Sequence, residues 1–304
     1  MKNVLYWPEG FKLSYTKSIM VQQSLSAIAQ TLVDALPYIR RFSGQYICIK
    51  YGGSVMVDEA LKQAFALGVN LCRYVGMKPV IVHGGGKEIS KWMSKVGKKA
   101  VFIDGQRFTD DETMELAEMV ISGKVNNDIV AELNKNGAKA IGLSGKSANL
   151  FTAARVEATQ KVDLGRVGRI LSVDPELIHN LTQQGYIPVI SPVSSDKLGH
   201  SLNLNADNVA SYVAQSLKAK KLIYLTDVDG LMIDGTLKKK MGVSEAKQLL
   251  AHQDVSGGMI PKLNFSIQAI EGGVHQVHMV NGHTEHAVLL EILTKGGVGT
   301  LIEA

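Results

Sequence analysis

Short apolar runs that end directly in tight turns constrain this chain more than any other feature. Residues 47–51 open into Gly52-Gly53, residues 79–83 into Gly84-Gly85-Gly86, and residues 222–225 into a turn over residues 226–230. Helical patterns separate these runs nearly throughout, and such alternation is typical of parallel strands joined by helical crossovers. The sequence therefore predicts an α/β fold, a three-layer αβα sandwich with a mainly parallel open sheet. Ligands of such folds bind beyond the carboxyl ends of the strands, where these turns lie.

Several stretches are predicted to be strands of that sheet. They cover residues 46–50, 79–82, 139–143, 186–190, 221–225 and 275–280. A polar stretch over residues 194–200 is typical of a loop, so we place the boundary between two lobes near Asp196. The expected organisation is an N-terminal extension over residues 1–44, an N-lobe over residues 45–195 and a C-lobe over residues 196–304.

Apolar residues in the N-terminal extension are spaced as one face of a helix that ends or kinks around Pro37. They are Leu25, Ile28, Ala29, Leu32, Val33 and Leu36. This helix precedes the α/β fold and is not needed to complete it. It either packs on its own domain or forms an oligomer contact, because an apolar stripe outside a complete fold needs something to cover it.

Composition argues against several classes of protein. No stretch approaches the roughly 18 unbroken apolar residues of a membrane span, and Met1-Lys2-Asn3 does not open a secretory signal, so we expect a cytoplasmic protein without membrane contact. The formal charge is +5, but the short lysine clusters of the chain lack interleaved aromatic residues, and we expect no nucleic acid partner.

Cys48 and Cys72 have no metal-ligand or disulfide spacing, so both should be buried and structural. His275 and His278 should face opposite sides of a strand, and we expect no dedicated metal site.

Two lysines stand on separate glycine turns. Lys50 precedes Gly52-Gly53, whereas the lysine of a P-loop follows its last glycine, so the ammonium sits on a strand end and the turn offers backbone N–H groups. Lys262 follows Gly257-Gly258, where a helical pattern begins. The two turns predict a polyphosphate held from two sides. The alternative is two ordinary tight turns with surface lysines.

Motifs that occur in a fixed order together resemble the amino acid kinase family, and within it the acetylglutamate kinases. They are Ile49-Lys50-Tyr51-Gly52-Gly53, Val82-His83-Gly84-Gly85-Gly86, Gly105-Gln106-Arg107-Phe108-Thr109, Asn203-Leu204-Asn205-Ala206-Asp207, Leu225-Thr226-Asp227-Val228-Asp229-Gly230 and Gly257-Gly258-Met259-Ile260-Pro261-Lys262. The resemblance implies an enzyme that transfers the γ-phosphoryl group of ATP to the side-chain carboxylate of N-acetyl-L-glutamate, an early step towards arginine. It also implies Mg²⁺, held chiefly by phosphates and water.

The chemistry suits these residues, because a carboxylate acceptor is already ionised at neutral pH and needs no general base. The site must instead supply alignment and positive charge. The resemblance implies that Lys50 and Lys262 stabilise the transition state and that Asp207 orients both lysines. Asp207 could instead be only a helix cap.

By the same resemblance, the N-lobe binds the amino-acid substrate and the C-lobe binds ATP. The implied substrate residues are Gly84, Gly85, Arg107 and Asn203. The implied nucleotide residues are Gly52, Gly53, Asp227 and Met259, with Asp229 beside them. Arg107 should grip the α-carboxylate, because a guanidinium offers a bidentate fork. Alternatively, Arg107 is a surface residue after a turn, and Asp227 and Asp229 only stabilise the turn that contains them.

The N-terminal helix and residues 286–301 resemble the arginine-inhibited, hexameric branch of the family. This implies a homo-hexamer, a trimer of dimers, with L-arginine as an effector bound in part by Glu291 and Gly297. The alternative is a plain terminal helix and strand. Ser147, Ala148, Asn149, Arg166 and Arg169 depart from the family's usual residues, and the arginines could alter the charge of a substrate-side hairpin.

Two rival functions stay open. The first is a sibling kinase that acts on glutamate or on a carrier-bound aminoadipate. The second is a non-catalytic amino acid sensor, which should have lost Lys50, Lys262 or Asp207. This chain retains all three.

Overall fold

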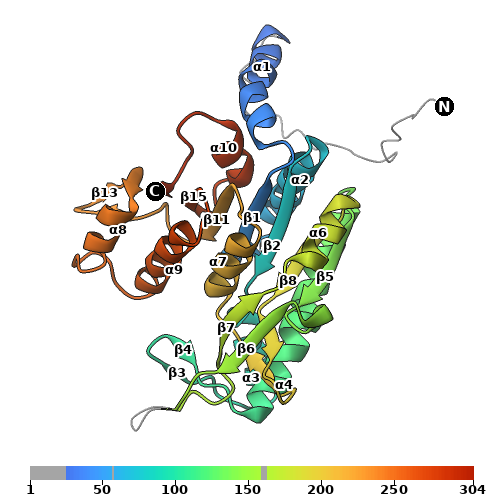
Figure 1. Ribbon diagram of the computed structural model, residues 1–304, viewed down its shortest axis with the longest axis vertical. Helices are drawn as coiled ribbons and strands as arrows, with labels where there is room; N and C mark the ends of the chain where they lie inside the picture. The colour runs from blue at the N-terminus through green and yellow to red at the C-terminus, as the bar shows by residue number, and fades with distance from the viewer. Residues whose placement is uncertain (1–24, 57, 159–162) are drawn as a thin grey trace, which may run out of the picture.

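The computed structural model describes residues 25–56, 58–158 and 163–304, and across these residues the central sheet has eight strands (Figure 1). Their order is β14-β16-β15-β11-β1-β2-β8-β5. All neighbours are parallel except β15 and β16. The strands are β1 (Tyr46–Tyr51), β2 (Lys78–His83), β5 (Ala140–Ser144), β8 (Ile187–Ser191), β11 (Lys221–Thr226), β14 (Lys240–Gly242), β15 (Gln276–Asn281) and β16 (Thr300–Glu303). Each predicted strand lies within one residue of its expected bounds, and the mainly parallel sheet is confirmed.

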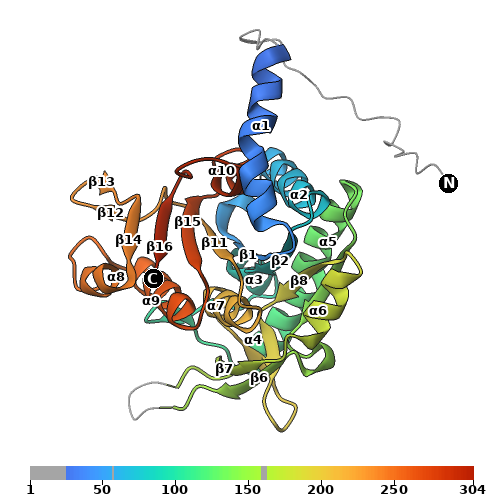
Figure 2. The same cartoon turned by 45° about the horizontal axis from the view of Figure 1, so that its top comes forward.

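Helices cover both faces of the sheet and complete the predicted three layers (Figure 2). One face carries α6 (Glu176–Gln183), α7 (Ala206–Ser216), α8 (Val243–Leu249) and α9 (Met259–Glu271). The other carries α2 (Glu59–Tyr74), α3 (Gly86–Lys95), α4 (Asp111–Glu118), α5 (Asn126–Lys135) and α10 (Ala287–Leu293). In β1, Cys48 belongs to the first core, whereas Ile47 and Ile49 belong to the second, because successive strand side chains alternate between faces.

A π-helical segment, Met119–Val125, joins α4 to α5. Such segments occur mostly as single turns within α-helices and are frequent at functional sites. Two-stranded hairpins accompany the main sheet: β3 (Phe102–Ile103) with β4 (Gln106–Arg107), β6 (Phe151–Arg155) with β7 (Gly168–Val173), β9 (Val193–Ser195) with β10 (Ser201–Asn203), and β12 (Met232–Ile233) with β13 (Thr236–Leu237). The polar stretch predicted as a loop is largely the turn of the β9–β10 hairpin. The sheet crosses the predicted lobe boundary where β1 pairs with β11, and the division near Asp196 stays a prediction.

Helix α1 (Leu25–Phe42) stands out from the body of the molecule (Figure 1). It continues through Pro37, so of the two expected outcomes, an end or a kink, the structure excludes the end. A proline inside a helix removes one backbone hydrogen bond, and the surrounding turns can still continue. Leu32 and Val33 are 69% and 59% exposed, so the described part of the chain does not cover the apolar stripe. Residues 1–24 of the predicted extension lie outside the described residues.

Both cysteines are buried and free, as the sequence predicts. Burial raises the pKa of both thiols, that of Cys72 to about 12, so neither is a reactive thiolate. Among the described helices, none combines the length and the apolar character that crossing a membrane requires.

Candidate active site

Two lysines from different elements pair with one carboxylate at the carboxyl end of the sheet. Lys50 Nζ lies 2.9 Å from Oδ1 of Asp207, and Lys262 Nζ lies 2.7 Å from Oδ2. Lys50 is in β1, Asp207 is in the first turn of α7, and Lys262 is in the first turn of α9. The three side chains are between 13% and 16% exposed, so they are shielded from bulk water and still reachable by a ligand.

The pKa of Asp207 reflects this geometry. Burial alone would raise the pKa of the carboxyl, but the charges of Lys50 and Lys262 outweigh burial and hold the pKa at about 2. Asp207 is therefore ionised at neutral pH, and an ammonium group faces each of its oxygens. Two ammonium groups against one carboxylate leave one positive charge in excess, which favours binding of an anion.

Two residues that were not predicted to have a role hold this cluster in place. Tyr224 donates a hydrogen bond from its hydroxyl to the backbone carbonyl of Asp207 at 3.0 Å, and Lys262 Nζ lies 5.4 Å from the centre of its ring. Asn205 caps α7, because its side-chain oxygen accepts from the backbone N–H groups of Asp207 and Asn208. Asn205 thus fills the capping role that was the alternative for Asp207. A tyrosine in an otherwise aliphatic strand is the sequence signal that could have singled out Tyr224.

The glycines of the first turn make room for charged side chains. A β-carbon at Gly52 would lie 3.0 Å from Lys50 Nζ, so the lack of a side chain lets the ammonium fold over the turn. Gly53 has a φ of +73°, a conformation that favours glycine, and a β-carbon there would clash with the carboxylate of Asp227. The structure therefore brings together three residues predicted for the nucleotide side, namely Gly52, Gly53 and Asp227.

The other residues predicted for the nucleotide side follow β11 or begin α9. Met259 begins α9, one turn before Lys262, and packs half-buried against the core. Asp229 accepts a hydrogen bond from the side-chain amide of Asn281 at 2.7 Å. Asp227 lies 3.9 Å from Lys87 Nζ.

A cavity of about 700 Å³ opens beside Lys50 and the turn Gly84-Gly85-Gly86. It extends between α2, α3 and α5. Lysines at its mouth include Lys87 and Lys124, while Phe65 and Leu133 give it an apolar floor. Acidic side chains of Glu59, Glu88, Asp128 and Glu132 line it as well, so the predicted substrate turn borders an open space with charges of both signs around it.

Arg107 reaches the start of α3 from β4. Its Nη2 donates to the carbonyl of Gly86 and to Oγ of Ser90, each at 2.8 Å, and its guanidinium lies 4.7 Å from the centre of the Phe102 ring. Arg107 is only 7% exposed, so the alternative of a surface arginine is wrong. Burial lowers the pKa of its guanidinium, which still remains charged at neutral pH. Arg107 thus lies next to the predicted substrate turn.

Asn203 is linked to Arg107 through a residue that was not predicted to have a role. The Asn203 side-chain amide donates to Oγ1 of Thr109 at 3.2 Å, and this hydroxyl donates to the carbonyl of Arg107 at 2.8 Å. The backbone of Arg166 bridges the same segments, since its N–H donates to the Thr109 carbonyl and its carbonyl accepts from the Asn203 N–H. Thr109, which is fully buried, therefore fixes two predicted substrate residues relative to each other.

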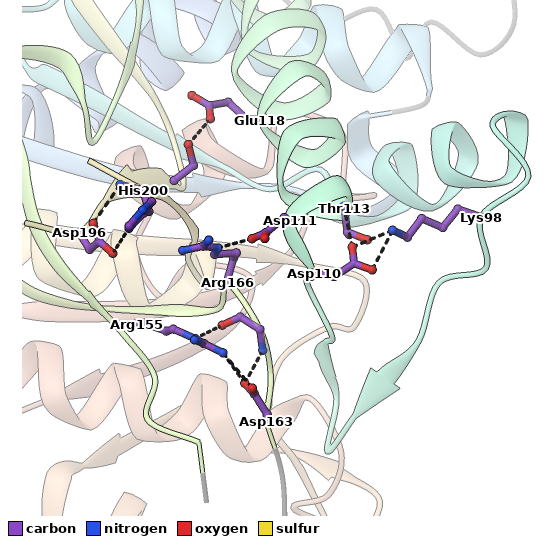
Figure 3. A network of polar contacts seen from close by, with 12 residues as sticks. Lys98, Asp110, Asp111, Thr113, Glu118, Arg155, Asp163, Arg166, Asp196 and His200 are labelled. Atoms are coloured by element: carbon purple, nitrogen blue, oxygen red, sulfur yellow. Dashed lines mark hydrogen bonds and ion pairs between the residues drawn. The ribbon is translucent and has the colours of Figure 1, made fainter. Parts of the chain in front are cut away.

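Ion pairs tie together the loops on this side of the molecule (Figure 3). Arg166 pairs with Asp111 at the start of α4, and Arg155 pairs with Asp163. The extra positive charge of Arg166, which could have altered the hairpin, is thus balanced by Asp111. Exposed pairs of this kind usually contribute about 1 kcal/mol or less to stability.

The other atypical positions, residues 147–149, form a short 3₁₀ turn after β5. Ala148 and Asn149 have φ values of +48° and +54°. Residues other than glycine rarely adopt this left-handed conformation. The backbone of this turn is therefore strained at Ala148 and Asn149.

A second charged cluster contains both residues predicted for the effector. Glu291 on α10 pairs with His278 through Oε1 and accepts the backbone N–H of Val298 through Oε2 at 2.9 Å. Gly297 has a φ of +60°, and a β-carbon there would clash with the Glu291 carboxylate. Lys221 Nζ donates to the Glu291 backbone carbonyl at 3.0 Å. Lys221 and His278 had no predicted role in this cluster.

Three possible metal ligands lie close together elsewhere. Ligand atoms of Asp234, His252 and Asp254 lie within 4.8 Å of one another, near the β12–β13 hairpin. None of these residues belongs to the predicted site. His275 is exposed and His278 is buried, in agreement with their expected opposite orientations.

Comparisons with known proteins agree with this geometry. The model of the amino acid kinase family matches residues 45–281. The acetylglutamate kinase of Methanocaldococcus jannaschii is 49% identical over 90% of this chain and 95% of its own, and that of Kosmotoga olearia is 49% identical over 90% and 96%.

A solved structure has a similar fold. The N-acetylglutamate synthase of Neisseria gonorrhoeae, complexed with coenzyme A and N-acetyl-glutamate, superimposes with a TM-score of 0.82 at 27% identity. The match covers 91% of this chain and 63% of the synthase chain. The matched family and the two kinases show that this chain is a kinase of the amino acid kinase family and belongs, within that family, to the acetylglutamate kinases.

Proposed function

We propose that this kinase transfers the γ-phosphoryl group of ATP to the side-chain carboxylate of N-acetyl-L-glutamate, giving N-acetyl-L-glutamyl 5-phosphate in arginine biosynthesis. The observation that carries the proposal is the pairing of Lys50 and Lys262 on Asp207. This arrangement holds two ammonium groups in one place with one positive charge in excess. We also keep the cytoplasm as the expected compartment.

The two lysines suit the charge that develops in phosphoryl transfer. Negative charge spreads over the equatorial, entering and leaving oxygens of the transition state. Ammonium groups that are already held in place can stabilise this charge with little reorganisation. Asp207 supplies that hold, so we assign it to orient Lys50 and Lys262 rather than to act as a base.

The acceptor needs alignment rather than activation, because a carboxylate is ionised at neutral pH. We assign Arg107 to the α-carboxylate, since a guanidinium can donate two parallel hydrogen bonds to it. Asn203 would bind the same substrate, and the turn at Gly84 and Gly85 would take its other carboxylate. The link through Thr109 supports this assignment because it keeps Arg107 and Asn203 at a fixed spacing.

Mg²⁺ would enter together with ATP, and we assign it no dedicated protein ligand. Asp207 does not fit a metal, because both of its oxygens already face lysines. Mg²⁺ retains several waters and often binds through substrate phosphates. When bound, it would neutralise part of the triphosphate charge, and Gly52, Gly53 and Asp227 would line the nucleotide beside it.

We further propose that L-arginine inhibits the enzyme from a site that includes Glu291 and Gly297, and that α1 assembles a homo-hexamer as a trimer of dimers. The position of Phe42, the last residue of α1, supports a link between the two. Lys221 Nζ lies 5.2 Å from the centre of the Phe42 ring and 3.0 Å from the Glu291 carbonyl. A ligand near Glu291 would therefore lie close to the end of α1.

Trapping of the acyl phosphate tests the proposed reaction. The enzyme would be incubated with ATP, Mg²⁺ and hydroxylamine, and with N-acetyl-L-glutamate, glutamate or α-aminoadipate as acceptor. We expect a hydroxamate and an equal amount of ADP with N-acetyl-L-glutamate, and far less of either with the other acceptors. A larger yield with another acceptor, or no hydroxamate at all, would reject the proposed substrate.

A further inference from the structure

A buried histidine lies directly beneath the predicted substrate turn. His83 is the last residue of β2 and is fully buried, and Asn126, the first residue of α5, is 3% exposed. Nδ1 of His83 lies 2.8 Å from the carbonyl of Gly84, and Nε2 lies 2.9 Å from the side-chain nitrogen of Asn126. The proposed mechanism gives neither side chain a role.

The partners of this pair define where its hydrogens lie. The side-chain nitrogen of Asn126 also lies 2.9 Å from the backbone carbonyl of Val189, which can only accept, so the amide nitrogen must be the atom that faces both groups. That nitrogen donates to Nε2 of His83, which must then be the unprotonated ring nitrogen. The ring hydrogen is therefore on Nδ1 and is donated to the Gly84 carbonyl. Burial lowers the pKa of His83 to about 4, in agreement with a neutral ring.

This chain of hydrogen bonds reaches the substrate turn through a single peptide plane. The Gly84 carbonyl and the Gly85 N–H belong to the same peptide and point in opposite directions, because a trans peptide is planar. The Gly84 N–H is fixed as well, since it donates to the carbonyl of Tyr51 at 2.9 Å. Holding the Gly84 carbonyl on His83 therefore directs the Gly85 N–H away from the histidine.

Side-chain packing leaves the amide of Asn126 little freedom to turn. A β-carbon at Gly142 would clash with Oδ1 of Asn126, so this oxygen lies directly against the backbone of β5. A β-carbon at Gly85 would lie only 3.2 Å from Ile121, a residue of the π-helical segment that leads into Asn126. The π-helical segment thus contacts the turn and also positions the asparagine beneath it.

We propose that His83, held by Asn126 as its Nδ1–H tautomer, is a positioning residue that aims the Gly85 N–H at the reacting carboxylate of the acceptor. This inference rests on the proposed function for the identity of the acceptor. The tautomer and the peptide orientation do not depend on it.

Two substitutions separate this role from simple packing. His83→Asn keeps a donor near the position of Nδ1, whereas His83→Gln places its amide near the position of Nε2 and loses the donor to Gly84. We expect His83→Gln to lower kcat/KM for N-acetyl-L-glutamate by about tenfold or more, and His83→Asn by less than about threefold, with KM for ATP nearly unchanged in both. A packing role predicts the reverse order, because glutamine is closer to histidine in volume. Equal losses or the reverse order would overturn the proposal.

A second measurement needs neither turnover nor a variant that folds. Nitrogen NMR of histidine-labelled wild-type enzyme at neutral pH distinguishes the two neutral tautomers from the imidazolium. We expect His83 to carry its hydrogen on Nδ1, and a hydrogen on Nε2 would overturn the proposal. A wild-type enzyme that gives no hydroxamate from N-acetyl-L-glutamate would reject the proposed function instead, and the NMR result would still decide the tautomer.

Discussion

The molecule has two charged clusters that are shielded from solvent and that differ in net charge. At the carboxyl end of the sheet, one carboxylate, Asp207, faces Lys50 and Lys262, so positive charge is in excess. Beside α10, the single ammonium of Lys221 rests on a backbone carbonyl, and the carboxylate of Glu291 is paired with His278. Burial lowers the pKa of His278, so one ammonium and one carboxylate roughly balance there.

The two clusters differ in net charge and in solvent exposure, and these differences suit them to different roles. The side chains of Lys50, Asp207 and Lys262 are between 13% and 16% exposed, and a bound anion would balance the excess positive charge of their cluster. The side chains of His278 and Glu291 are each 4% exposed, and both oxygens of Glu291 already have partners. A guanidinium would have to share this carboxylate with His278 and the Val298 N–H or displace one of them. We therefore expect the first cluster to control the rate of reaction and the second to control only regulation.

The largest expected effect comes from removing a lysine of the unbalanced cluster. Lys50→Ala or Lys262→Ala should lower kcat by about 100-fold, because each removes a positioned charge that is commonly worth about 3 kcal/mol in the barrier. ADP formation would give kcat, and circular dichroism would report folding. Lys247→Ala, at a side chain of α8 that is 54% exposed, is the surface control. Lys221→Met is the matched change in the balanced cluster and should leave kcat within about threefold. Similar losses in all four variants would remove the distinction between the clusters.

A smaller effect is expected at the substrate end of the catalytic site. Arg107→Lys should raise KM for N-acetyl-L-glutamate by about tenfold, because lysine lacks the planar fork that grips a carboxylate at two points. KM for ATP should change little. Arg169→Lys is a control on a neighbouring hairpin. Normal affinity for the acceptor in Arg107→Lys would exclude the proposed clamp.

The unbalanced cluster should also make stability depend on pH. The pKa of Asp207 is about 2 in the folded protein, below the ordinary value of 3.8, so its ionised form stabilises the fold above that value. This contribution is lost as pH falls from about 4 towards 2, and it amounts to about 2 kcal/mol at neutral pH. We expect urea unfolding to show Asp207→Asn less stable than wild type at neutral pH, with the gap narrowing in acid. A difference in the free energy of unfolding that does not change with pH would contradict the proposed ion pairs of Asp207 with Lys50 and Lys262.

The smallest effect on turnover is expected in the balanced cluster. Glu291→Gln should abolish inhibition by L-arginine and leave the uninhibited kcat within about twofold, because the carboxylate is the group that would pair with a guanidinium. Inhibition curves would be compared with those of Glu285→Gln, whose side chain is 77% exposed on the same segment. If Glu291→Gln loses turnover as well as inhibition by arginine, the proposal that the two clusters have separate roles is wrong. A wild-type enzyme that ignores arginine would remove the effector role altogether.

The sequence predicts the sheet well because its strands are short, apolar and bounded by glycine turns. Lys50, Lys262 and Asp207 could be singled out for the same reason, since each stands at an element end that carries a recognisable motif. The contacts of Tyr224 and Thr109 could not be predicted, because they join segments that are not adjacent in the chain, although a tyrosine among aliphatic residues marks Tyr224 as unusual. The sequence left an end or a kink at Pro37 open, because local helix rules cannot weigh the turns on either side, which here continue the helix.

The most direct test is a structure of the enzyme with N-acetyl-L-glutamate and a non-hydrolysable ATP analogue. We expect the ammonium groups of Lys50 and Lys262 to lie within hydrogen-bond distance of the terminal phosphoryl oxygens, with Asp207 still between them. Side chains of Lys50 and Lys262 that turn away from the bound nucleotide would contradict the proposed mechanism.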